Sequence, residues 1–447
     1  MTNREKSRWW WEARTIMAAS AGNAFEYFDL TLYTFFAVVI GQVMFPAQDP
    51  GAQILLSLGV FGVGYCARPI GAVFFGNYAD SRGRKAAVNL SLLLMATGTG
   101  LIGIAPTYAQ VGLLAPIIVL AGRLLQGFSS GGETGALTTL LVESAPSNRR
   151  GFYASWALAT QGIATMFGSG AAWIASASLT PEQLNAWGWR IPFFLGIMIV
   201  PIARYLRRTL EETLDEVTAA QSKQRAPITV MAANYKKTAI LALLGAAGGN
   251  VTYVIFNLYM PTYAIHELGL PVSVSVGAGL CAAITTAVLA PLGGYLSDIF
   301  GRKPPQIIAR ILIIVLAYPA FMLISAKPST LVLLATVTGM SFLLAMISGY
   351  YAHMAESFPK SVRASGFATM YALSTVLIGG FSQMIITALI QWTGNKTIPA
   401  SYLVIVGLLS LIGVIFLRPH QPEPGDVLVH ADAPGTAVLR PASLPEA

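Results

Sequence analysis

The chain contains twelve apolar stretches at nearly regular intervals, each long enough to cross a bilayer as a helix. About 20 helical residues are needed to cross the hydrocarbon core of a membrane. A soluble protein does not need so many apolar runs of this length, because its surface helices keep a polar face. The sequence therefore predicts an all-α integral membrane protein with twelve transmembrane helices. We place them at 15–43, 51–79, 87–106, 111–142, 153–178, 187–206, 239–265, 272–297, 306–326, 330–353, 363–392 and 399–418.

The composition supports lipid as the solvent. Only 11% of the 447 residues are charged and 55% are hydrophobic, whereas a soluble domain has roughly 25% charged residues. The net charge of +8 does not indicate nucleic acid, because the basic residues form short clusters between the apolar runs. We expect the lipid bilayer, and no nucleic acid, as a partner.

Residues for metal or covalent chemistry are sparse. Cys66 and Cys281 both lie inside apolar stretches, and the four histidines form no cluster with them. This pattern predicts neither a disulfide framework nor a metal site, and we expect no cofactor. No Gly-x4-Gly-Lys-Ser/Thr loop is present, which disfavours an ATP-driven pump. We find no nucleophile and base at one membrane depth, so an enzyme is also disfavoured.

The distribution of lysine and arginine predicts the topology. These residues accumulate on the cytoplasmic side of membrane proteins, and the opposite loops hold only Lys327, Lys396 and the boundary residue Arg190. Both termini are therefore expected in the cytoplasm. As a separate expectation, we place this multi-pass protein in a cell membrane, the bacterial inner membrane. The predicted cytoplasmic clusters are Arg82-Gly83-Arg84-Lys85, Arg149-Arg150, Arg204 to Lys237, Arg302-Lys303, and Lys360 with Arg363.

A single long internal loop separates two sets of six spans. We therefore predict two six-helix bundles, a first half at 15–206 and a second half at 239–418. The remaining parts are a cytoplasmic N-terminal segment at 1–14, a cytoplasmic linker at 207–238 and a tail at 419–447. The tail is rich in Pro, Ala and Gly without an apolar period, which is typical of disordered segments.

Two loops, one in each half, share the pattern Gly-x3-Asp-x2-Gly-Arg-Lys. The first glycine of this pattern allows close helix packing, and the second favours a turn with positive φ. The aspartate can face a helix N-terminus or the nearby arginine, where it would act as a charged gating contact. The simpler alternative is a basic cytoplasmic turn with no other role. The two loops are Gly76-x3-Asp80-x2-Gly83-Arg84-Lys85 and Gly294-x3-Asp298-x2-Gly301-Arg302-Lys303.

A second pattern, Glu-Ser-x-Pro-x3-Arg, also occurs once in each half. Its two copies are separated by nearly the same number of residues as the two copies of the first pattern. Two repeated patterns in the same order weaken the interpretation as a simple turn, and they disfavour a channel or a scaffold. They indicate a chain of two sequence-related halves. The copies are Glu143-Ser144-x-Pro146-x3-Arg150 and Glu356-Ser357-x-Pro359-x3-Arg363.

With these loops the chain resembles the major facilitator superfamily, whose signature is the Gly-x3-Asp-x2-Gly-Arg-Lys/Arg pattern. The resemblance implies two halves with a substrate site between them and transport by alternating access. Within the superfamily the chain is similar to the metabolite:proton symporters, over about residues 15–418. The matching segments are Gly22 to Asp29, Arg68-Pro69-Ile70-Gly71, Gly122 to Ser129, Gly132-Glu133 and Trp187 to Phe194.

A finer resemblance points to one branch of that family. The segments Leu389 to Lys396 and Leu113 to Phe128 look most like those of citrate and tricarboxylate carriers. The segment Gly131 to Thr134 departs from them and follows the general family form. This branch would imply a tricarboxylate as the substrate.

Charged residues inside the first span need a reason, because each costs about 2.5–3.5 kcal/mol at a helix centre. Asn23, Glu26, Asp29 and Tyr33 lie on one face of the predicted helix. Two carboxylates so close together in a low dielectric disfavour joint ionisation, so we predict that Glu26 and Asp29 couple transport to protons. The alternative is that an arginine pairs permanently with one of them for structure.

The fourth span offers the complementary charge. Arg123, Gln126 and Glu133 lie on one face, and a guanidinium binds a carboxylate through a bidentate fork. We predict that Arg123 and Gln126 bind the substrate, or that Arg123 pairs with a first-span acid until substrate competes. Arg68 has a similar role or a packing role, and Glu133 carries protons or pairs with an arginine.

The second half holds fewer candidates. Asn250, Tyr253 and Asn257 are spaced for one face of the seventh span, where Tyr253 and Asn257 are predicted to contact substrate together with Asn23 of the first half. Interhelical contact is the alternative for the amides. We expect Arg310 to extend toward the cytoplasmic interface, as arginines near helix ends do.

These residues favour proton symport of a small organic acid, such as citrate, another di- or tricarboxylate or 2-oxoglutarate, by a monomeric secondary transporter. The rival is proton-coupled uptake of a zwitterionic or neutral metabolite, such as betaine or shikimate. The sum of buried charges does not decide between them, because the acids in the first half can neutralise its arginines.

Overall fold

Helices account for all the regular structure among the described residues. The computed structural model describes residues 23–47, 49–82, 84–131, 133–198, 235–359 and 362–420. The predictions for the segment 1–14, nearly all of the linker 207–238, the tail beyond residue 420 and Gly83 lie outside these ranges. So do those that depend on the side chains of Asp80, Arg84 and Glu133.

The first half begins with a bent pair of helices. A helix at Asn23–Phe35 meets α2 (Ala37–Met44) at an angle of 62°. The elements that follow are α3 (Pro50–Cys66), α4 (Arg68–Arg82), α5 (Arg84–Ile104), α6 (Tyr108–Val111), α7 (Leu114–Ser129), α8 (Glu133–Ser144), α9 (Arg150–Ser178), α10 (Pro181–Ala186) and the 3-10 turn η1 (Gly188–Arg190).

The second half contains two helices interrupted by π turns. Its elements are α13 (Lys236–Tyr253), the π segment η2 (Val254–Tyr259), α14 (Met260–His266), α15 (Val272–Ile299), α16 (Lys303–Ala326), α17 (Thr330–Met346), α18 (Tyr350–Glu356), α19 (Arg363–Ser374), the π segment η3 (Thr375–Gly380), α20 (Ser382–Thr393) and α21 (Ile398–Phe416).

Helical residues occupy all twelve of the ranges predicted as spans. Within the described ranges, seven helices are long and apolar enough to cross a membrane, or eight when the bent first pair is counted as one span. The third span and the start of the fourth appear as shorter apolar helices, Asn89–Ile104 and Leu114–Ser129. The fold is thus all-helical and membrane-spanning.

Several helix ends follow from local sequence. Asp49 caps α3, because its carboxylate accepts a hydrogen bond from the Ala52 amide at 2.8 Å. Thr180 begins α10 with a capping box. Gly394 ends α20 in the left-handed conformation, at a φ of 69°, that glycine adopts without strain.

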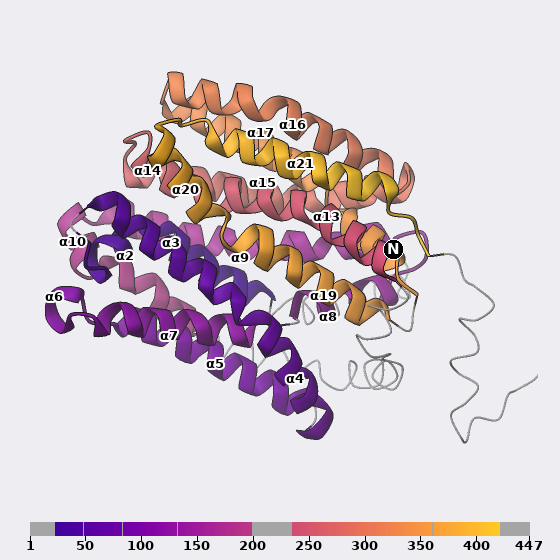
Figure 1. Ribbon diagram of the computed structural model, residues 1–447, viewed down its shortest axis with the longest axis horizontal. Coiled ribbons are helices and arrows are strands. Elements are labelled where there is room, and N and C mark those ends of the chain that lie inside the picture. The colour runs from indigo at the N-terminus through magenta and orange to yellow at the C-terminus, as the bar shows by residue number, and fades with distance from the viewer. Residues whose placement is uncertain are drawn as a thin grey trace, which may run out of the picture.

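The two halves meet along α9 and α15, which lie side by side in the middle of Figure 1, with α5 and α7 on one side and α16 and α21 on the other. The contact depends on small residues. A Cβ atom at Gly162 would stand 2.6 Å from the Ala287 nitrogen, and one at Gly151 would stand 2.6 Å from the Gly294 oxygen. Such close approach of backbones is how helices associate in lipid.

The outer faces of the helices carry apolar side chains. Leu331 is 78% exposed, Val288 66% and Ile70 66%, whereas charged Glu26 and Arg123 are only 2% exposed. This is the reverse of a soluble protein, and it fits a molecule whose surroundings are hydrocarbon.

Gly162→Leu is expected to lower the free energy of unfolding by about 1–3 kcal/mol, because the added atoms must push α9 away from α15. Thermal unfolding in detergent measures the effect. Gly170→Leu is the matched control on the same helix, since a Cβ at Gly170 has nothing within 4 Å. Equal melting temperatures for the two variants would contradict this account of the interface.

Candidate functional site

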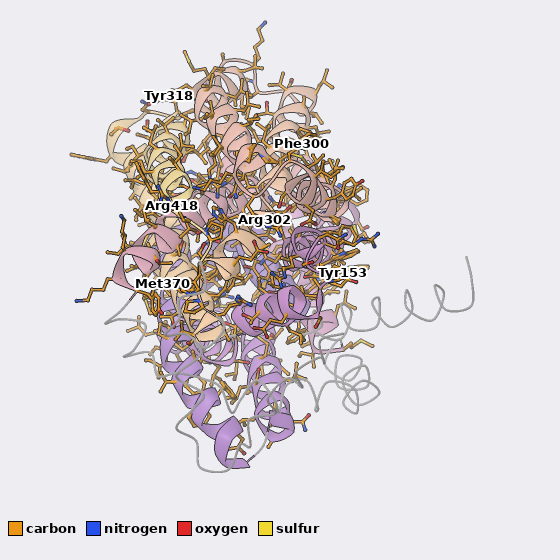
Figure 2. The ribbon with its side chains drawn as sticks, turned by 90° about the vertical axis from the view of Figure 1, so that its right-hand side faces the viewer. Tyr153, Phe300, Arg302, Tyr318, Met370 and Arg418 are labelled. Atoms are coloured by element: carbon orange, nitrogen blue, oxygen red, sulfur yellow. The ribbon has the colours of Figure 1, made fainter. Side chains whose placement is uncertain are left out.

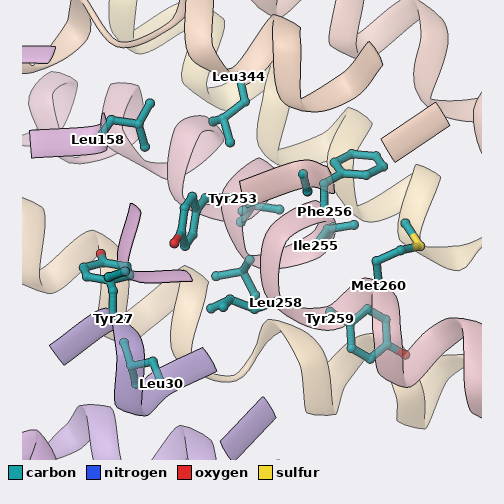
Figure 3. Close-up of a cluster of buried hydrophobic side chains, with 14 of the residues drawn as sticks. Tyr27, Leu30, Leu158, Tyr253, Ile255, Phe256, Leu258, Tyr259, Met260 and Leu344 are labelled. Atoms are coloured by element: carbon teal, nitrogen blue, oxygen red, sulfur yellow. The ribbon is translucent and has the colours of Figure 1, made fainter. Parts of the chain in front are cut away.

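A central cavity lies between the two halves. Together with the open space at its mouth, it holds about 560 Å³ of atom-free space. Figure 3 shows part of its wall, with Tyr27 and Leu158 of the first half facing Tyr253, Leu258 and Leu344 of the second. The other lining residues are Tyr65, Gln161, Ala246, Gly249, Asn250, Val254, Ile347, Ser348, Tyr350, Tyr351, Tyr371 and Thr375.

The polar groups of this cavity are neutral. The Tyr351 and Tyr371 hydroxyls are 3.2 Å apart, and the Gln161 amide donates to them at 3.4 and 3.5 Å. The Asn250 amide donates to the Ser374 hydroxyl at 3.1 Å. Hydroxyls and amides both donate and accept hydrogen bonds, so this wall can bind a polar substrate of either charge.

A second, smaller cavity lies within the first half and shares Tyr65 with the central one. Together with the open space at its mouth, it holds about 240 Å³ of atom-free space. Five residues predicted from the sequence line it together, although three separate helices carry them. They are Glu26, Asp29, Arg68, Arg123 and Gln126.

Glu26 and Arg68 form a buried ion pair in this cavity. The Arg68 Nη2 atom lies 2.5 Å from the Glu26 Oε1 atom, and the two side chains are 7% and 2% exposed. The guanidinium also stacks on the Tyr65 ring, 4.0 Å from its centroid. Of the two acids in the first span, Glu26 is thus the one in direct contact with an arginine.

Asp29 has a different environment. The Thr99 hydroxyl and the Gln126 amide donate to its Oδ2 atom, the latter at 3.2 Å. Its Oδ1 atom is buried and has no hydrogen-bond partner among the described residues. Arg123 reaches Asp29 only through Gln126, whose Oε1 atom accepts from the Arg123 Nη1 atom at 2.8 Å. A neutral amide therefore separates this acid from its cation.

Two aromatic rings pack against the Arg123 guanidinium. Its guanidinium carbon lies 4.6 Å from the Tyr33 ring centroid and 4.8 Å from the Phe61 ring centroid. Cation–π contacts of this kind stabilise a desolvated guanidinium. Tyr33, on the predicted polar face of the first helix, thus contacts the fourth span.

Two predicted substrate contacts lie elsewhere. The Asn23 amide donates to the Thr160 hydroxyl of α9 at 3.2 Å, and Asn257 accepts from the Thr286 hydroxyl of α15 at 3.2 Å. Neither asparagine is among the described residues that line the two cavities. Asn257 lies within η2, whose π turns change the number of residues per turn. The α-helical spacing that predicted one face for Tyr253 and Asn257 therefore does not apply there.

The structure adds residues that the sequence did not single out. Thr99 binds Asp29, and Tyr65 separates the two cavities. A threonine or tyrosine inside an apolar run has no net charge to mark it, and its role depends on which helix it faces. Tyr253 was predicted and does line the central cavity, where its hydroxyl lies 2.6 Å from the Thr165 hydroxyl.

The repeated loop of the second half forms a latch between the halves, which we define as Asp298, Arg302 and Glu356. Asp298 accepts hydrogen bonds from the Gly151 and Phe152 amides at 2.8 Å each, at the N-terminus of α9. It also accepts from Arg302 at 2.6 Å. The aspartate thus occupies both predicted positions at once, and the positive helix end favours its charge.

Arg302 continues the latch to α18. It donates to the two Glu356 carboxylate oxygens at 2.8 and 2.9 Å, and Figure 2 shows it centrally at one end of the molecule. Burial opposes its charge, but the hydrogen bonds and charges of Glu356 and Asp298 outweigh burial and raise the pKa of Arg302. Gly301 has a φ of 89°, which confirms the predicted turn.

Arg310 corrects a prediction. It is 2% exposed and does not extend to the interface. Its guanidinium donates to the Ser410 hydroxyl and to the Gly245 carbonyl, both at 3.0 Å. Ser410 belongs to α21 and Gly245 to α13, so polar groups of these two helices replace water around the side chain.

Metal ligands do not gather in the part of the chain that the structure describes. No group of three or more His, Cys, Asp or Glu side chains there could hold a metal ion.

Arg68→Met is expected to lower the free energy of unfolding by about 3–5 kcal/mol, because it removes the cation that contacts the buried Glu26 carboxylate. The double variant Glu26→Gln/Arg68→Met should recover most of that loss. Chemical unfolding in detergent measures both. In the control Arg363→Met the partner Glu143 is 24% exposed and 3.8 Å away, so a smaller loss is expected. A double variant as unstable as Arg68→Met would refute the pairing.

Comparison with known proteins places these features in a family. The family model described as Major Facilitator Superfamily matches residues 20–373 and 278–442. A citrate-proton symporter of Klebsiella pneumoniae is 37% identical over 405 residues, 90% of this chain and 91% of that protein. A proline/betaine transporter of Salmonella typhimurium is 32% identical over 426 residues, 92% of this chain and 84% of that protein.

The fold agrees with this match. The crystal structure of a D-xylose-proton symporter has a TM-score of 0.70 at 16% identity, and the alignment covers 92% of this chain and 98% of that one. Among the described residues the chain is all-helical, and seven or eight of its helices are long and apolar enough to cross a membrane. The chain is a multi-pass membrane transporter and not an enzyme, and it belongs to the major facilitator superfamily.

Proposed function

We propose that the chain is a proton symporter of a small organic acid, such as citrate, another di- or tricarboxylate or 2-oxoglutarate. The observation that carries this proposal is the pair of adjoining cavities. One lies between the halves and has neutral polar walls, and the other holds buried acids and arginines next to the shared Tyr65. The similarity to citrate-proton symporters supports the substrate class.

The proposed topology has twelve spans with both termini in the cytoplasm. The helices at the twelve predicted ranges support it, and so does the concentration of Lys and Arg on one side of those helices. The bundles are residues 15–206 and 239–418, joined by the linker 207–238. A single chain supplies both walls of the central cavity, which supports a monomer as the working unit, with the lipid bilayer as its surroundings.

Asp29 is proposed as the main proton carrier. Its ligands in the described structure are neutral donors, and its Oδ1 atom has no partner there, so a proton can be added without breaking an ion pair. Protonation would weaken the hydrogen bond from Gln126, which in turn holds Arg123. Glu133 is proposed as a second carrier from its position in the sequence.

Arg68 is proposed to bind the substrate carboxylate in competition with Glu26. The pair adjoins Tyr65 at the wall of the central cavity, and a guanidinium can exchange one carboxylate for another. When substrate takes Arg68, the Glu26 carboxylate loses this ion pair and is better able to accept a proton. This exchange would link substrate and proton binding.

Alternating access requires that contacts between the halves open in turn. The latch joins the loop after α15 to the N-terminus of α9, and we propose that it opens when the cavity faces the cytoplasm. At the other end, the Thr262 hydroxyl donates to the Thr34 carbonyl at 3.2 Å. That contact must separate for outward opening. Gly76, Asp80, Gly83 and Arg84 are the proposed counterpart loop in the first half.

One observation favours a second candidate. The central cavity is lined by several tyrosines, and the rings of Tyr27 and Tyr253 meet edge to face with centroids 5.5 Å apart. Aromatic walls can bind a quaternary ammonium group through cation–π contacts. Proton-coupled uptake of a zwitterion such as betaine is therefore the alternative, and the similarity to proline/betaine transporters supports it.

Uptake into proteoliposomes tests the function directly. With an inward proton gradient of one pH unit, an organic acid should accumulate about tenfold for each coupled proton, because one unit is worth about 1.4 kcal/mol. Labelled citrate, 2-oxoglutarate, shikimate and betaine are compared, and liposomes without protein are the control. No accumulation of any of them under a proton gradient alone would refute symport.

Asp29→Asn is expected to abolish accumulation against a gradient while counterflow exchange partly persists, because the amide cannot release a proton. Uptake and exchange are measured in the same proteoliposomes. Asp49→Asn is the matched control, since Asp49 is an exposed helix cap that an asparagine replaces well. Unchanged accumulation in Asp29→Asn would exclude this residue from coupling.

A further inference from the structure

Arg310 on α16 is a buried cation whose partners in the described part of the chain are all neutral. Its hydrogen bonds go to the Ser410 hydroxyl, the Gly245 carbonyl and, at 3.1 and 3.2 Å, to the side chain and carbonyl of Gln306. These acceptors are all neutral. No acidic side chain forms an ion pair with Arg310 within the residues that the structure describes.

Arg310 stands directly behind the wall of the central cavity. Its guanidinium carbon lies 5.2 Å from the ring centroid of Tyr350, and Tyr350 lines the cavity. On α13 its contact residue Gly245 is next in sequence to Ala246, which also lines the cavity. One layer of side chains therefore separates the charge from the space for substrate.

The other buried arginines differ in this respect. Arg68 contacts Glu26 at 2.5 Å, and Arg123 is joined to Asp29 through Gln126. These two pairs cancel within the first half when both acids are ionised. Among the described residues no acid pairs with Arg310, so the field of its positive charge acts on whatever occupies the cavity.

We propose that Arg310 makes the central cavity selective for substrates with net negative charge, through its field and not through contact. The inference rests on the proposed transport function and deepens it, because it selects organic anions over zwitterions such as betaine. A unit charge acting over roughly 10 Å at an effective dielectric of about 20 changes the affinity for each substrate charge about tenfold. A zwitterion, whose opposite charges lie close together, feels little of this field.

A neutral neighbour gives the sharpest test. Ser410→Asp places a carboxylate beside the Arg310 Nε atom, which is 3.0 Å from the present hydroxyl, and Ser410→Asn has the same size without the charge. We expect Ser410→Asp to raise the KM for citrate at least about tenfold over Ser410→Asn. Inhibition of citrate uptake by glycine betaine should differ less than about threefold between them. Uptake is measured in proteoliposomes at one pH and a fixed gradient.

Substitutions of Arg310 itself form the second part of the experiment. Arg310→Lys keeps the charge but loses most of the hydrogen bonds, whereas Arg310→Gln keeps polarity and loses the charge. Only Arg310→Gln should lower the ratio of citrate affinity to betaine affinity, while thermal unfolding reports the structural cost of each. A purely structural role would shift both ligands by the same factor.

The outcomes separate the two proposals. If the unaltered protein takes up none of the anions, the proposed function fails, and the selectivity inference fails with it. If it takes up citrate but Ser410→Asp and Ser410→Asn have equal KM values, only the role of Arg310 is overturned. A charge-dependent loss of citrate affinity in both the Ser410 variants and the Arg310 variants supports the role of Arg310.

Discussion

A charged side chain in hydrocarbon must find its partner inside the protein, and the architecture of this molecule depends on that constraint. Glu26 meets Arg68, Asp29 meets Gln126 and Thr99, and each contact joins helices that are separate in the sequence. Because water is absent, such contacts persist only when the helices are held in register. The glycines between α9 and α15 provide that register for the two halves.

The same constraint goes with an unequal distribution of buried charge between the two halves. The first half gathers acids and arginines in one small cavity, whereas the second half contributes hydroxyls, amides and a cation behind the wall. Tyr65 stands where the two cavities meet. This arrangement suits a transporter in which proton binding and substrate binding are neighbouring events, with the moving interface between the halves.

The latch belongs to the repeated sequence, and it is the contact that we propose to open and close during transport. Asp298 binds the N-terminus of α9 across the interface, while Arg302 ties it to Glu356 within the second half. Charge-assisted hydrogen bonds at the membrane surface are strong when formed, yet water can replace them when the halves separate. Such bonds are therefore better suited to a gate than contacts deep in the lipid region.

The sequence by itself determined the all-helical, membrane-spanning class, the approximate positions of the apolar helices, the repeated loop patterns and the candidate acids and arginines, because hydrophobic length and charge are local properties. Tertiary structure decided the partners. Glu26 and Asp29 are equivalent by spacing, but only Glu26 contacts an arginine. Thr99 carries no sequence signal, and Asn257 is displaced from the cavity by π turns. Arg310 is buried because α13 and α21 close over it, and no spacing along one helix encodes which neighbours will do so.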